Sequence, residues 1–428
     1  GIQFGIAMLR SFHCSNVLKS TKAQPIIIDE KYRWRWCLLL LSTAHGWSCN
    51  DAAATRFLQR ESLTEVDPLA VCNDGTGAAF YMQENASSND WLVYLAGGGW
   101  CYDLESCEGR FNGSLFPHQA CSSSTQSKPC FMSSKDYPPA CGKTGIFDVH
   151  EQSPLHAWNL VYVPYCTSDA FMGDGTFGSW HFRGARVVRA VLKKLKGRLE
   201  SGKRLLFGGG SAGGRGAMVF LDEVSHAFPQ LRVQGFLDSP FYLDVASFSS
   251  KFDGFQQQHL NVLKNFNATS VVSDRCGQRF PDQQWKCLFG QHRMPLLRTQ
   301  YLMAAAQYDS WQLSHLVHGY DGLENRPTYT AAEKQYAEDF AQKTRKELNR
   351  LKRVQPPGSS LYSSACYEHH ISEASSFWAK KVNGLSQADV LSNLGSAPAA
   401  TIAGCSNYNC GCSNGTDLAA LLEKVFVL

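Results

Sequence analysis

The stretch Leu205-Leu206-Phe207-Gly208-Gly209-Gly210-Ser211-Ala212-Gly213-Gly214 decides the fold. Its three apolar residues predict a buried strand, and residues 212–222 can form a helix. Ser211 stands between Gly209 and Gly213, which matches the sequence G-x-S-x-G of a nucleophile elbow. In an elbow the serine occupies a strained turn from strand to helix, so its neighbours must be small. The stretch therefore predicts an α/β protein with a serine exposed at one edge of a sheet.

The same glycines allow two other interpretations. Gly208, Gly210 and Gly213 also fit G-x-G-x-x-G, and Asp238 follows a further strand, where a dinucleotide site places its ribose-binding carboxylate. A structural turn without chemistry is the third interpretation. This stretch alone leaves all three open.

Strands and helices alternate along the chain from about residue 65. Apolar runs predict strands at 91–95, 160–163, 233–237 and 302–306, and an apolar stripe predicts a helix at 182–199. Such alternation indicates a mainly parallel sheet with helices on both faces. Segments 104–157 and 245–298 are longer and rich in Cys, Ser, Phe and Gln, and we expect them to be insertions at one end of the sheet.

Composition bounds the class of protein. The chain has 428 residues, of which 44% are hydrophobic and 18% charged, which excludes a disordered or coiled-coil protein. A net charge of +4 without a basic tract gives no sign of a nucleic-acid partner. The 16 cysteines are mostly scattered, and Cys101 and Cys107 are expected to close a short disulfide loop. Sequences of the type N-x-S/T occur at Asn85, Asn112, Asn267 and Asn414. A secreted or lumenal protein with disulfide-rich insertions is therefore expected.

The ends of the chain are predicted to lie outside the main domain, which is expected at 65–395. In segment 1–60, Arg33 and Arg35 precede an apolar run at 36–41, which resembles the start of a signal peptide; an unstructured extension is the alternative. The run is too short to span a membrane, which takes about 20 apolar residues. Segment 396–428 is expected to be a cysteine-rich tail.

A second glycine turn favours serine chemistry. Gly97, Gly98 and Gly99 follow the strand predicted at 91–95. Enzymes with an elbow serine use an earlier glycine turn to supply backbone donors for an oxyanion. The predicted donors are the amides of Gly98, Gly99 and Ala212. A sharp strand end without chemistry is the alternative.

An orienting acid should follow the serine. Asp309 comes directly after the strand predicted at 302–306, which suits this role. Asp238 and Asp244 compete with it, and the residues alone do not separate the three.

The candidate bases are His369 and His370, which lie in a predicted loop. His315 and His318 lie three residues apart on a predicted helix and suggest a metal, but no third ligand stands at suitable spacing, which favours a structural role.

The chain resembles the pectin acetylesterase family, which includes the Wnt-deacylating enzyme Notum. Within this family it is more similar to the plant-type members. The motifs that carry the resemblance run in order through residues 65–395. They are Ala70-Val71-Cys72-Asn73-Asp74-Gly75, Trp91-Leu92-Val93-Tyr94-Leu95-Ala96-Gly97-Gly98-Gly99-Trp100-Cys101, His181-Phe182-Arg183-Gly184, Gly210-Ser211-Ala212-Gly213-Gly214, Tyr308-Asp309-Ser310-Trp311-Gln312 and Cys366-Tyr367-Glu368-His369.

The resemblance implies an α/β-hydrolase fold that needs no metal or cofactor. It places the nucleophile at Ser211, the acid at Asp309, the base at His369 and the oxyanion hole at the amides of Gly98, Gly99 and Ala212. The chain departs from the family at Ala96, where Glu is usual, at Gly210, where Cys or Ser is frequent, and at His370, where plant members have Cys. The last departure implies a different disulfide near the base.

These inferences together predict a serine carboxylic ester hydrolase that removes acetyl groups from a polysaccharide such as pectin through an acyl-enzyme. Trp100 and Trp180 are the candidate substrate contacts, because indole rings can stack on sugars. A Notum-like carboxylesterase that removes a longer fatty acyl group from a protein is the alternative enzyme. An inactive carbohydrate-binding relative is the alternative from another class. A monomer without a membrane span is expected.

Overall fold

A sheet of ten strands organises the computed structural model, which describes residues 49, 54, 56–114, 121, 130–148, 153–320, 327–396, 400–405, 407–408 and 410–412. The strands of the chain are β1 (Arg56–Ser62), β2 (Ala79–Gln83), β3 (Asp90–Leu95), β4 (Ala140–Lys143), β5 (Asn159–Val163), β6 (Gly175–Phe177), β7 (Trp180–Phe182), β8 (Arg204–Gly210), β9 (Arg232–Asp238), β10 (Tyr301–Ala304), β11 (Tyr308–Asp309), β12 (Ser360–Ser363), β13 (Tyr367–Glu368) and β14 (Ala400–Ile402).

Helices connect these strands. They are α3 (Leu104–Asn112), α4 (Gly184–Glu200), α5 (Ala212–Ala227), α6 (Phe255–Asn265), α7 (Arg275–Arg279), α8 (Gly290–Arg293), α9 (Ser310–His318), α10 (Ala331–Val354), α11 (Ser376–Ala379) and α12 (Gln387–Ser392), with the 3-10 helices η2 (Gly145–Phe147), η3 (Ala268–Val271), η4 (Gln284–Leu288), η5 (Met294–Leu296) and η6 (Cys410–Cys412). No helix among the described residues combines the length and the hydrophobicity that a membrane crossing requires.

The sheet is parallel except at one edge. Its strand order is β14-β12-β10-β9-β8-β3-β5-β2-β1-β4. The strands from β14 to β5 pair in parallel, and β2, β1 and β4 add antiparallel pairs. The mainly parallel sheet predicted from the sequence is confirmed.

The predicted strands match β3, β5, β8, β9 and β10, with small differences at their ends. β8 continues through Gly210, because Gly210 pairs with Asp238 of β9. The helix predicted from residue 182 begins at Gly184, since Phe182 pairs with Gly175 in a small antiparallel sheet. Local pairing therefore decides where these elements start and stop.

The sheet reaches beyond the predicted domain at both ends. β1 begins at Arg56, inside the segment 1–60 that was predicted to lie outside the domain, and β14 lies in the predicted tail. Leu58 is the buried side chain of β1, so the strand has no apolar run that sequence could reveal. β4, in the segment predicted as an insertion, also joins the sheet edge. The predicted signal segment lies outside the described residues.

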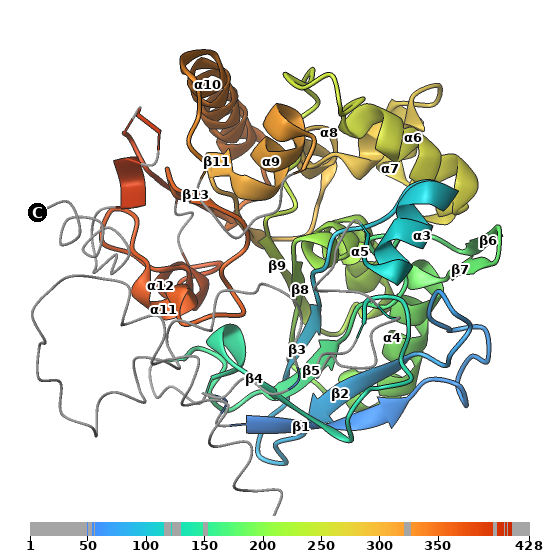
Figure 1. Cartoon of the computed structure of the whole chain (residues 1–428). Helices are drawn as coiled ribbons and strands as arrows, with labels where there is room; N and C mark the ends of the chain where they lie inside the picture. The colour runs from blue at the N-terminus through green and yellow to red at the C-terminus, as the bar shows by residue number, and fades with distance from the viewer. Residues whose placement is uncertain are drawn as a thin grey trace, which may run out of the picture. The chain divides into compact units, whose positions relative to one another are not determined.

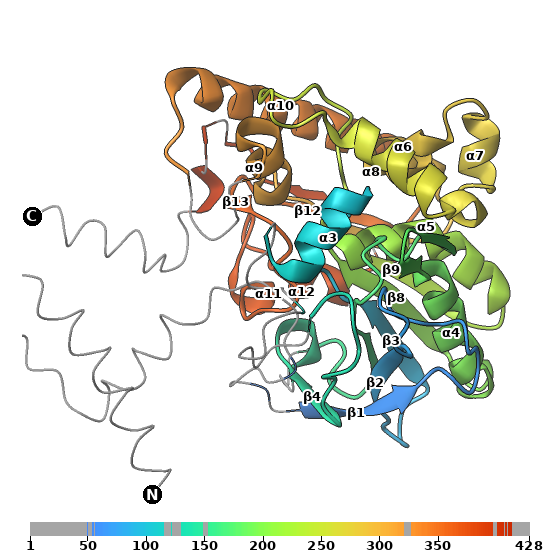
Figure 2. The same cartoon turned by 45° about the vertical axis from the view of Figure 1, so that its right-hand side comes forward.

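Helices cover both faces of the sheet. α4 and α5 lie on one side of the central strands, and α11 and α12 lie on the other (Figures 1 and 2). Along β9 the faces alternate: a methyl group on Gly235 would meet Leu221 of α5, whereas the ring of Phe236 packs 5.9 Å from that of Phe377 in α11. The doubly covered sheet explains why its strands are apolar on both faces.

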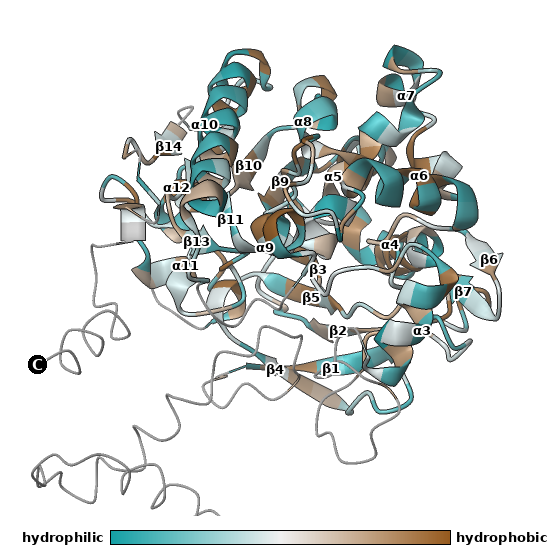
Figure 3. Cartoon of the chain, turned by 45° about the horizontal axis from the view of Figure 1, so that its top comes forward, coloured by the Kyte–Doolittle hydropathy of each residue, from teal (hydrophilic) through white to brown (hydrophobic). Residues whose placement is uncertain are grey.

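α10 is an amphipathic helix. Thr330 and Glu333 form a capping box at its start, and Phe340, Leu348 and Leu351 are among its buried side chains. Figure 3 shows α10 mainly in the hydrophilic colours. This contrast explains its position at the surface of the domain.

Two of the described disulfides join distant parts of the chain, and four close short local loops. The described pairs are Cys49–Cys141, Cys72–Cys166, Cys101–Cys107, Cys121–Cys130, Cys276–Cys287 and Cys405–Cys410, and Cys366 is also disulfide-bonded. The predicted local loop between Cys101 and Cys107 is confirmed. No cysteine is free in the described part of the chain.

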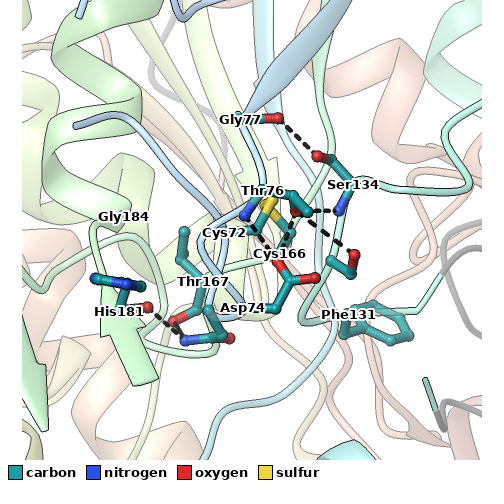
Figure 4. The surroundings of a disulfide bond; sticks show 12 residues. Cys72, Asp74, Thr76, Gly77, Phe131, Ser134, Cys166, Thr167, His181 and Gly184 are labelled. Atoms are coloured by element: carbon teal, nitrogen blue, oxygen red, sulfur yellow. Dashed lines mark hydrogen bonds between the residues drawn. A yellow bond between two sulfur atoms is a disulfide. The ribbon is translucent and has the colours of Figure 1, made fainter. Parts of the chain in front are cut away.

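The disulfide between Cys72 and Cys166 joins the motif at 70–75 to the segment after β5 (Figure 4). The side-chain amide of Asn73 donates to the carbonyls of Thr167 and His181, at 2.9 and 2.7 Å. The motifs at 70–75 and 181–184 therefore serve to join β7 to the loop after β5.

Gly213 gives a test of how tightly α5 packs on the sheet. A methyl group added at Gly213 would lie 1.9 Å from the carbonyl oxygen of Leu95, at the end of β3. Overpacking costs about 1–3 kcal/mol even where side chains can adjust, and this contact is with backbone. We expect Gly213→Ala to lower the melting temperature by several degrees or to prevent folding, measured by scanning calorimetry.

Gly197→Ala in α4 is the matched control. A methyl group there has no atom within 4 Å, so the variant should melt at or above the wild-type temperature, because alanine favours a helix over glycine by about 1 kcal/mol. Equal melting of the two variants would show that α5 does not pack as described.

Candidate active site

Ser211 occupies a strained turn between β8 and α5. Its φ of 54° and ψ of −120° lie outside the regions that non-glycine residues favour, which costs about 1–3 kcal/mol. Two backbone hydrogen bonds hold the turn: the Ser211 N–H donates to the carbonyl of Asp238, and the Arg215 N–H donates to that of Ser211, both at 2.9 Å. The elbow geometry predicted from the glycines is present.

His369 lies between Ser211 and Asp309. Its Nε2 is 2.6 Å from the Ser211 hydroxyl, and its Nδ1 is 2.9 Å from Oδ2 of Asp309. A neutral imidazole with its proton on Nδ1 would donate to the carboxylate and accept from the serine. All three side chains are buried. The structure thus brings together residues that are up to 158 positions apart in the sequence.

A short pair of strands sets the distance between acid and histidine. β11 and β13 pair in parallel, with Tyr308 facing Tyr367 and Asp309 facing Glu368. His369 follows Glu368 directly and is therefore beside Asp309. The two motifs that contain Asp309 and His369 meet through the backbone pairing of β11 with β13, which explains how the two side chains come into contact.

The carboxylate of Asp309 is held in one orientation. Asp309 is the N-cap of α9, and its Oδ1 accepts a hydrogen bond from the Gln312 N–H at 2.9 Å. The other oxygen, Oδ2, remains for His369. The side chain of Gln312 accepts from the Leu243 N–H, which joins α9 to the segment after β9.

Asp238, a competing candidate for the acid, has a different position. Its Oδ2 accepts from the backbone N–H groups of Ile371 and Ser372, each at 2.9 Å. Burial raises the pKa of this carboxyl group, against the hydrogen bonds that lower it. The next residue, Ser239, accepts from the His370 N–H at 3.0 Å. Asp238 and Ser239 therefore anchor the loop that follows His369.

The remaining candidates lie in other contacts. Asp244 is 3.5 Å from His292, and His318 is 3.2 Å from Glu333. His315 bonds the Trp311 carbonyl through Nδ1 at 2.8 Å, and burial lowers its pKa to about 4. Within the described ranges, His, Cys, Asp and Glu side chains form no group of three that could hold a metal ion.

The glycine turn after β3 lies directly beside Ser211. A methyl group on Gly97 would be 3.1 Å from the Ser211 Cβ. Gly98 has a φ of 149° and Gly99 a φ of 66°, and a Cβ on either would overlap Phe131 or Trp311. These two positions therefore require glycine.

Three backbone amides in this region have no acceptor in the part of the protein that the structure describes. Among the described residues, nothing accepts a hydrogen bond from the N–H groups of Gly98, Gly99 and Ala212. Ala212 is the first residue of α5, where the amide has no partner within the helix. Such groups beside a serine hydroxyl are suited to bind an oxygen that gains negative charge.

Sequence analysis missed Arg110 of α3. It is fully buried, its Nε donates to the Ser168 hydroxyl at 2.9 Å, and its Nη2 donates to the Gly98 carbonyl. Desolvation lowers its pKa to about 10, so the guanidinium stays charged at neutral pH. The Gly98 carbonyl and the Gly99 N–H belong to one planar peptide group. Because Arg110 holds the carbonyl, it also fixes the direction of the Gly99 N–H. No spacing in the sequence indicates this long-range contact.

The two tryptophans expected to contact substrate are nearly buried. Trp100 is 4% exposed, and its Nε1 donates to Gln258 at 3.1 Å. Trp180 is 8% exposed, its ring packs 4.9 Å from that of Phe111, and its Nε1 donates to Glu108. This packing does not favour the prediction that the rings stack on a sugar.

Comparisons with known proteins agree with this fold. A family model described as Pectinacetylesterase matches residues 55–396. The palmitoleoyl-protein carboxylesterase NOTUM of Mus musculus is 30% identical over 259 residues, which are 57% of this chain and 49% of that protein. Pectin acetylesterase 11 of Arabidopsis thaliana is 26% identical over 262 residues, which are 58% of this chain and 61% of that protein.

A solved structure is also similar. The structure of the Wnt deacylase Notum from Drosophila superposes with a TM-score of 0.71 and 25% sequence identity, and covers 84% of this chain and 99% of that one. The predicted α/β-hydrolase-like fold is thereby confirmed. The chain spans about half the length of the mouse relative. Identity is higher with the mouse protein than with the Arabidopsis protein, although the motifs favoured plant members. Because the family model covers the elbow, the positions of Asp309 and His369 and every strand of the sheet except β14, the chain belongs to the pectinacetylesterase family.

Proposed function

We propose that the chain is a serine carboxylic ester hydrolase with Ser211 as nucleophile, His369 as general base and Asp309 as the orienting acid. The observation that carries this proposal is the continuous chain of two hydrogen bonds, 2.6 and 2.9 Å long, from the serine through the imidazole to the carboxylate. The names of the relatives, which describe carboxylesterases and a pectin acetylesterase, support it.

The first step is acylation. His369 Nε2 takes the proton of Ser211 while Oγ attacks the ester carbonyl carbon, and the carbonyl electron pair moves to its oxygen. The amides of Gly98, Gly99 and Ala212 bind the resulting oxyanion. When the intermediate collapses, the alcohol leaves with the proton from His369, and the acyl group stays on Ser211.

The second step is deacylation by water. His369 takes a proton from the water, whose oxygen attacks the acyl carbon, and then returns the proton to Ser211 as the carboxylic acid leaves. Asp309 stabilises the imidazolium in both steps and keeps the proton of the neutral ring on Nδ1. The rigid turn keeps Oγ close to the imidazole, so little entropy is lost in orienting these two groups when the transition state forms.

The proposed substrate is an acetyl ester on a polysaccharide such as pectin. The family description and the Arabidopsis relative support this class. The second candidate is removal of a fatty acyl group from a protein, which is favoured by the names of the mouse and Drosophila relatives. Disulfides distributed through the domain support a secreted or lumenal location.

Acetate release tests the proposed function. Purified protein should release acetate from acetylated pectin or xylan, measured with a coupled acetate assay, and Ser211→Ala should lower kcat by about 10⁴-fold or more. The fold of the variant is checked by circular dichroism. Ser201→Ala, a surface serine at the end of α4, is the control and should keep full activity.

Two outcomes would count against this proposal. Hydrolysis that persists in folded Ser211→Ala would exclude Ser211 as nucleophile. Release of palmitoleate from an acylated peptide with no release of acetate would transfer the proposal to the second candidate.

Arg110 gives an independent test of the oxyanion donors. Arg110→Met keeps most of the side-chain volume but leaves the Gly98 carbonyl without its donor, so the Gly99 amide should lose its orientation. We expect kcat to fall by about 100-fold while KM changes little, because the oxyanion forms only in the transition state. An equal kcat in wild type and folded variant would show that this contact does not position the donors.

A further inference from the structure

Arg215 is a second buried arginine close to the nucleophile. It lies four residues after Ser211 on α5, so both residues share one face of the helix start. Its side chain is 1% exposed. The guanidinium carbon lies 4.2 Å from the centre of the Trp100 ring and 4.9 Å from that of Tyr242. A charged group is therefore enclosed by aromatic rings one helical turn after the reacting serine.

Among the described residues, no acidic side chain pairs with the charge of Arg215. Within the described residues no carboxylate lies within ion-pair distance, and Nε has no hydrogen-bond partner. Nη2 donates to His259 Nε2 and, at 3.3 Å, to the Leu288 carbonyl. Desolvation lowers the pKa of Arg215 only to about 10, whereas desolvation and the neighbouring guanidinium lower the pKa of His259 well below its usual value. The pair is thus a cationic arginine and a neutral histidine.

Aromatic side chains complete this cluster. The ring of Trp100 is 5.3 Å from that of Tyr242, 6.3 Å from His259 and 5.9 Å from Trp311. Trp311 in turn is 6.1 Å from His369. We define the acyl wall as Trp100, Arg215, Tyr242 and His259, all of which are buried.

The mechanism leaves one side of Ser211 for the acyl group, and we assign the acyl wall to that side. The leaving alcohol must lie toward His369 to receive a proton, and the oxyanion must lie toward the glycine turn. Tyr242, a member of this wall, lies close enough to Ser211 and Asp309 for its hydroxyl to interact with both. Trp100 follows Gly99 directly, so the wall continues from the oxyanion donors.

On the basis of the proposed function, we propose that Arg215 closes the acyl side of the site and restricts the enzyme to esters of short acids such as acetate. A longer alkyl chain would need the space that the guanidinium and its rings occupy. Moving Arg215 away would break its contact with the Trp100 face and its hydrogen bonds to His259 and Leu288, and would leave a buried charge unsolvated. A rotamer change therefore cannot open the site at low cost.

The restriction is tested with p-nitrophenyl esters from acetate to palmitate. For wild type we expect kcat/KM to fall by about 100-fold from acetate to octanoate. Methylene groups that the site cannot accommodate raise the free energy of the transition state. Arg215→Ala removes the guanidinium and should reduce the acetate-to-octanoate ratio by about tenfold or more. Arg215→Met keeps most of the volume but is uncharged and flexible, and it should shift the ratio in the same direction. It tests the inference also when the alanine variant does not fold.

Arg293→Ala is the matched control. Arg293 is equally buried, at 1% exposure, but its guanidinium donates to the carbonyls of Cys287 and Val219 and pairs with Asp274, none of which belongs to the acyl wall. Its variant should lose stability without a change in the ester ratio.

The outcomes separate this inference from the proposed function. An unchanged ratio in folded Arg215→Ala and Arg215→Met, with activity that still depends on Ser211, would overturn the inference alone. A wild-type preference for octanoate over acetate would also overturn it and leave the esterase in place. Absence of hydrolysis for every ester would overturn the proposed function and this inference with it.

Discussion

The contact between α5 and the ends of β3 and β8 is the constraint on which the site depends. Gly213 approaches the Leu95 carbonyl so closely that no side chain fits, and Gly209 in turn faces the backbone of Gly213. This approach forces the chain at Ser211 into a φ of 54°, because the turn must reverse within one residue. The same packing leaves the Ala212 amide at the free start of the helix, beside the glycine turn of β3. A single steric condition thus positions both the nucleophile and one oxyanion donor.

Buried polar groups carry out the remaining positioning. Asp238 holds the loop after His369 through two backbone amides, and Arg110 holds the turn that contains Gly98. Both groups are fully desolvated, so each is costly to the folded state by itself. Their hydrogen bonds to backbone offset that cost and restrict the two loops to one geometry. The site is therefore rigid for an electrostatic reason as well as a steric one.

Much of this arrangement is visible in the sequence, and the missing part has a common cause. Strand-ending glycines predicted the elbow and the second turn, since glycine is required where backbones approach. The sequence alone left Asp309 and Asp238 equivalent, because both follow strands of the same sheet. What separates them is the pairing of β11 with β13, two strands of only two residues each, which brings Asp309 beside His369 although the two are 60 positions apart. Arg110 and Arg215 were not recognised for a similar reason: an arginine in a helix predicts an exposed side chain, and only tertiary packing shows that it is enclosed.

The acyl wall bears on how one fold supports different ester substrates. An ester reacts at the place set by the sheet, by the turn at Ser211 and by the loop that carries His369. In the proposed site, none of these contacts the far end of the acyl group. That end meets side chains contributed by the first turn of α5 and by segments after β3 and β9, which can change without disturbing the backbone of the site. In this chain those positions hold a charged group among rings, with His259 and the Leu288 carbonyl as its hydrogen-bond partners. A cation in such surroundings excludes hydrocarbon more firmly than an apolar side chain of equal volume, because displacing it costs solvation as well as contact. The inference for Arg215 therefore makes acyl selectivity in this chain depend on a buried charge as much as on cavity size.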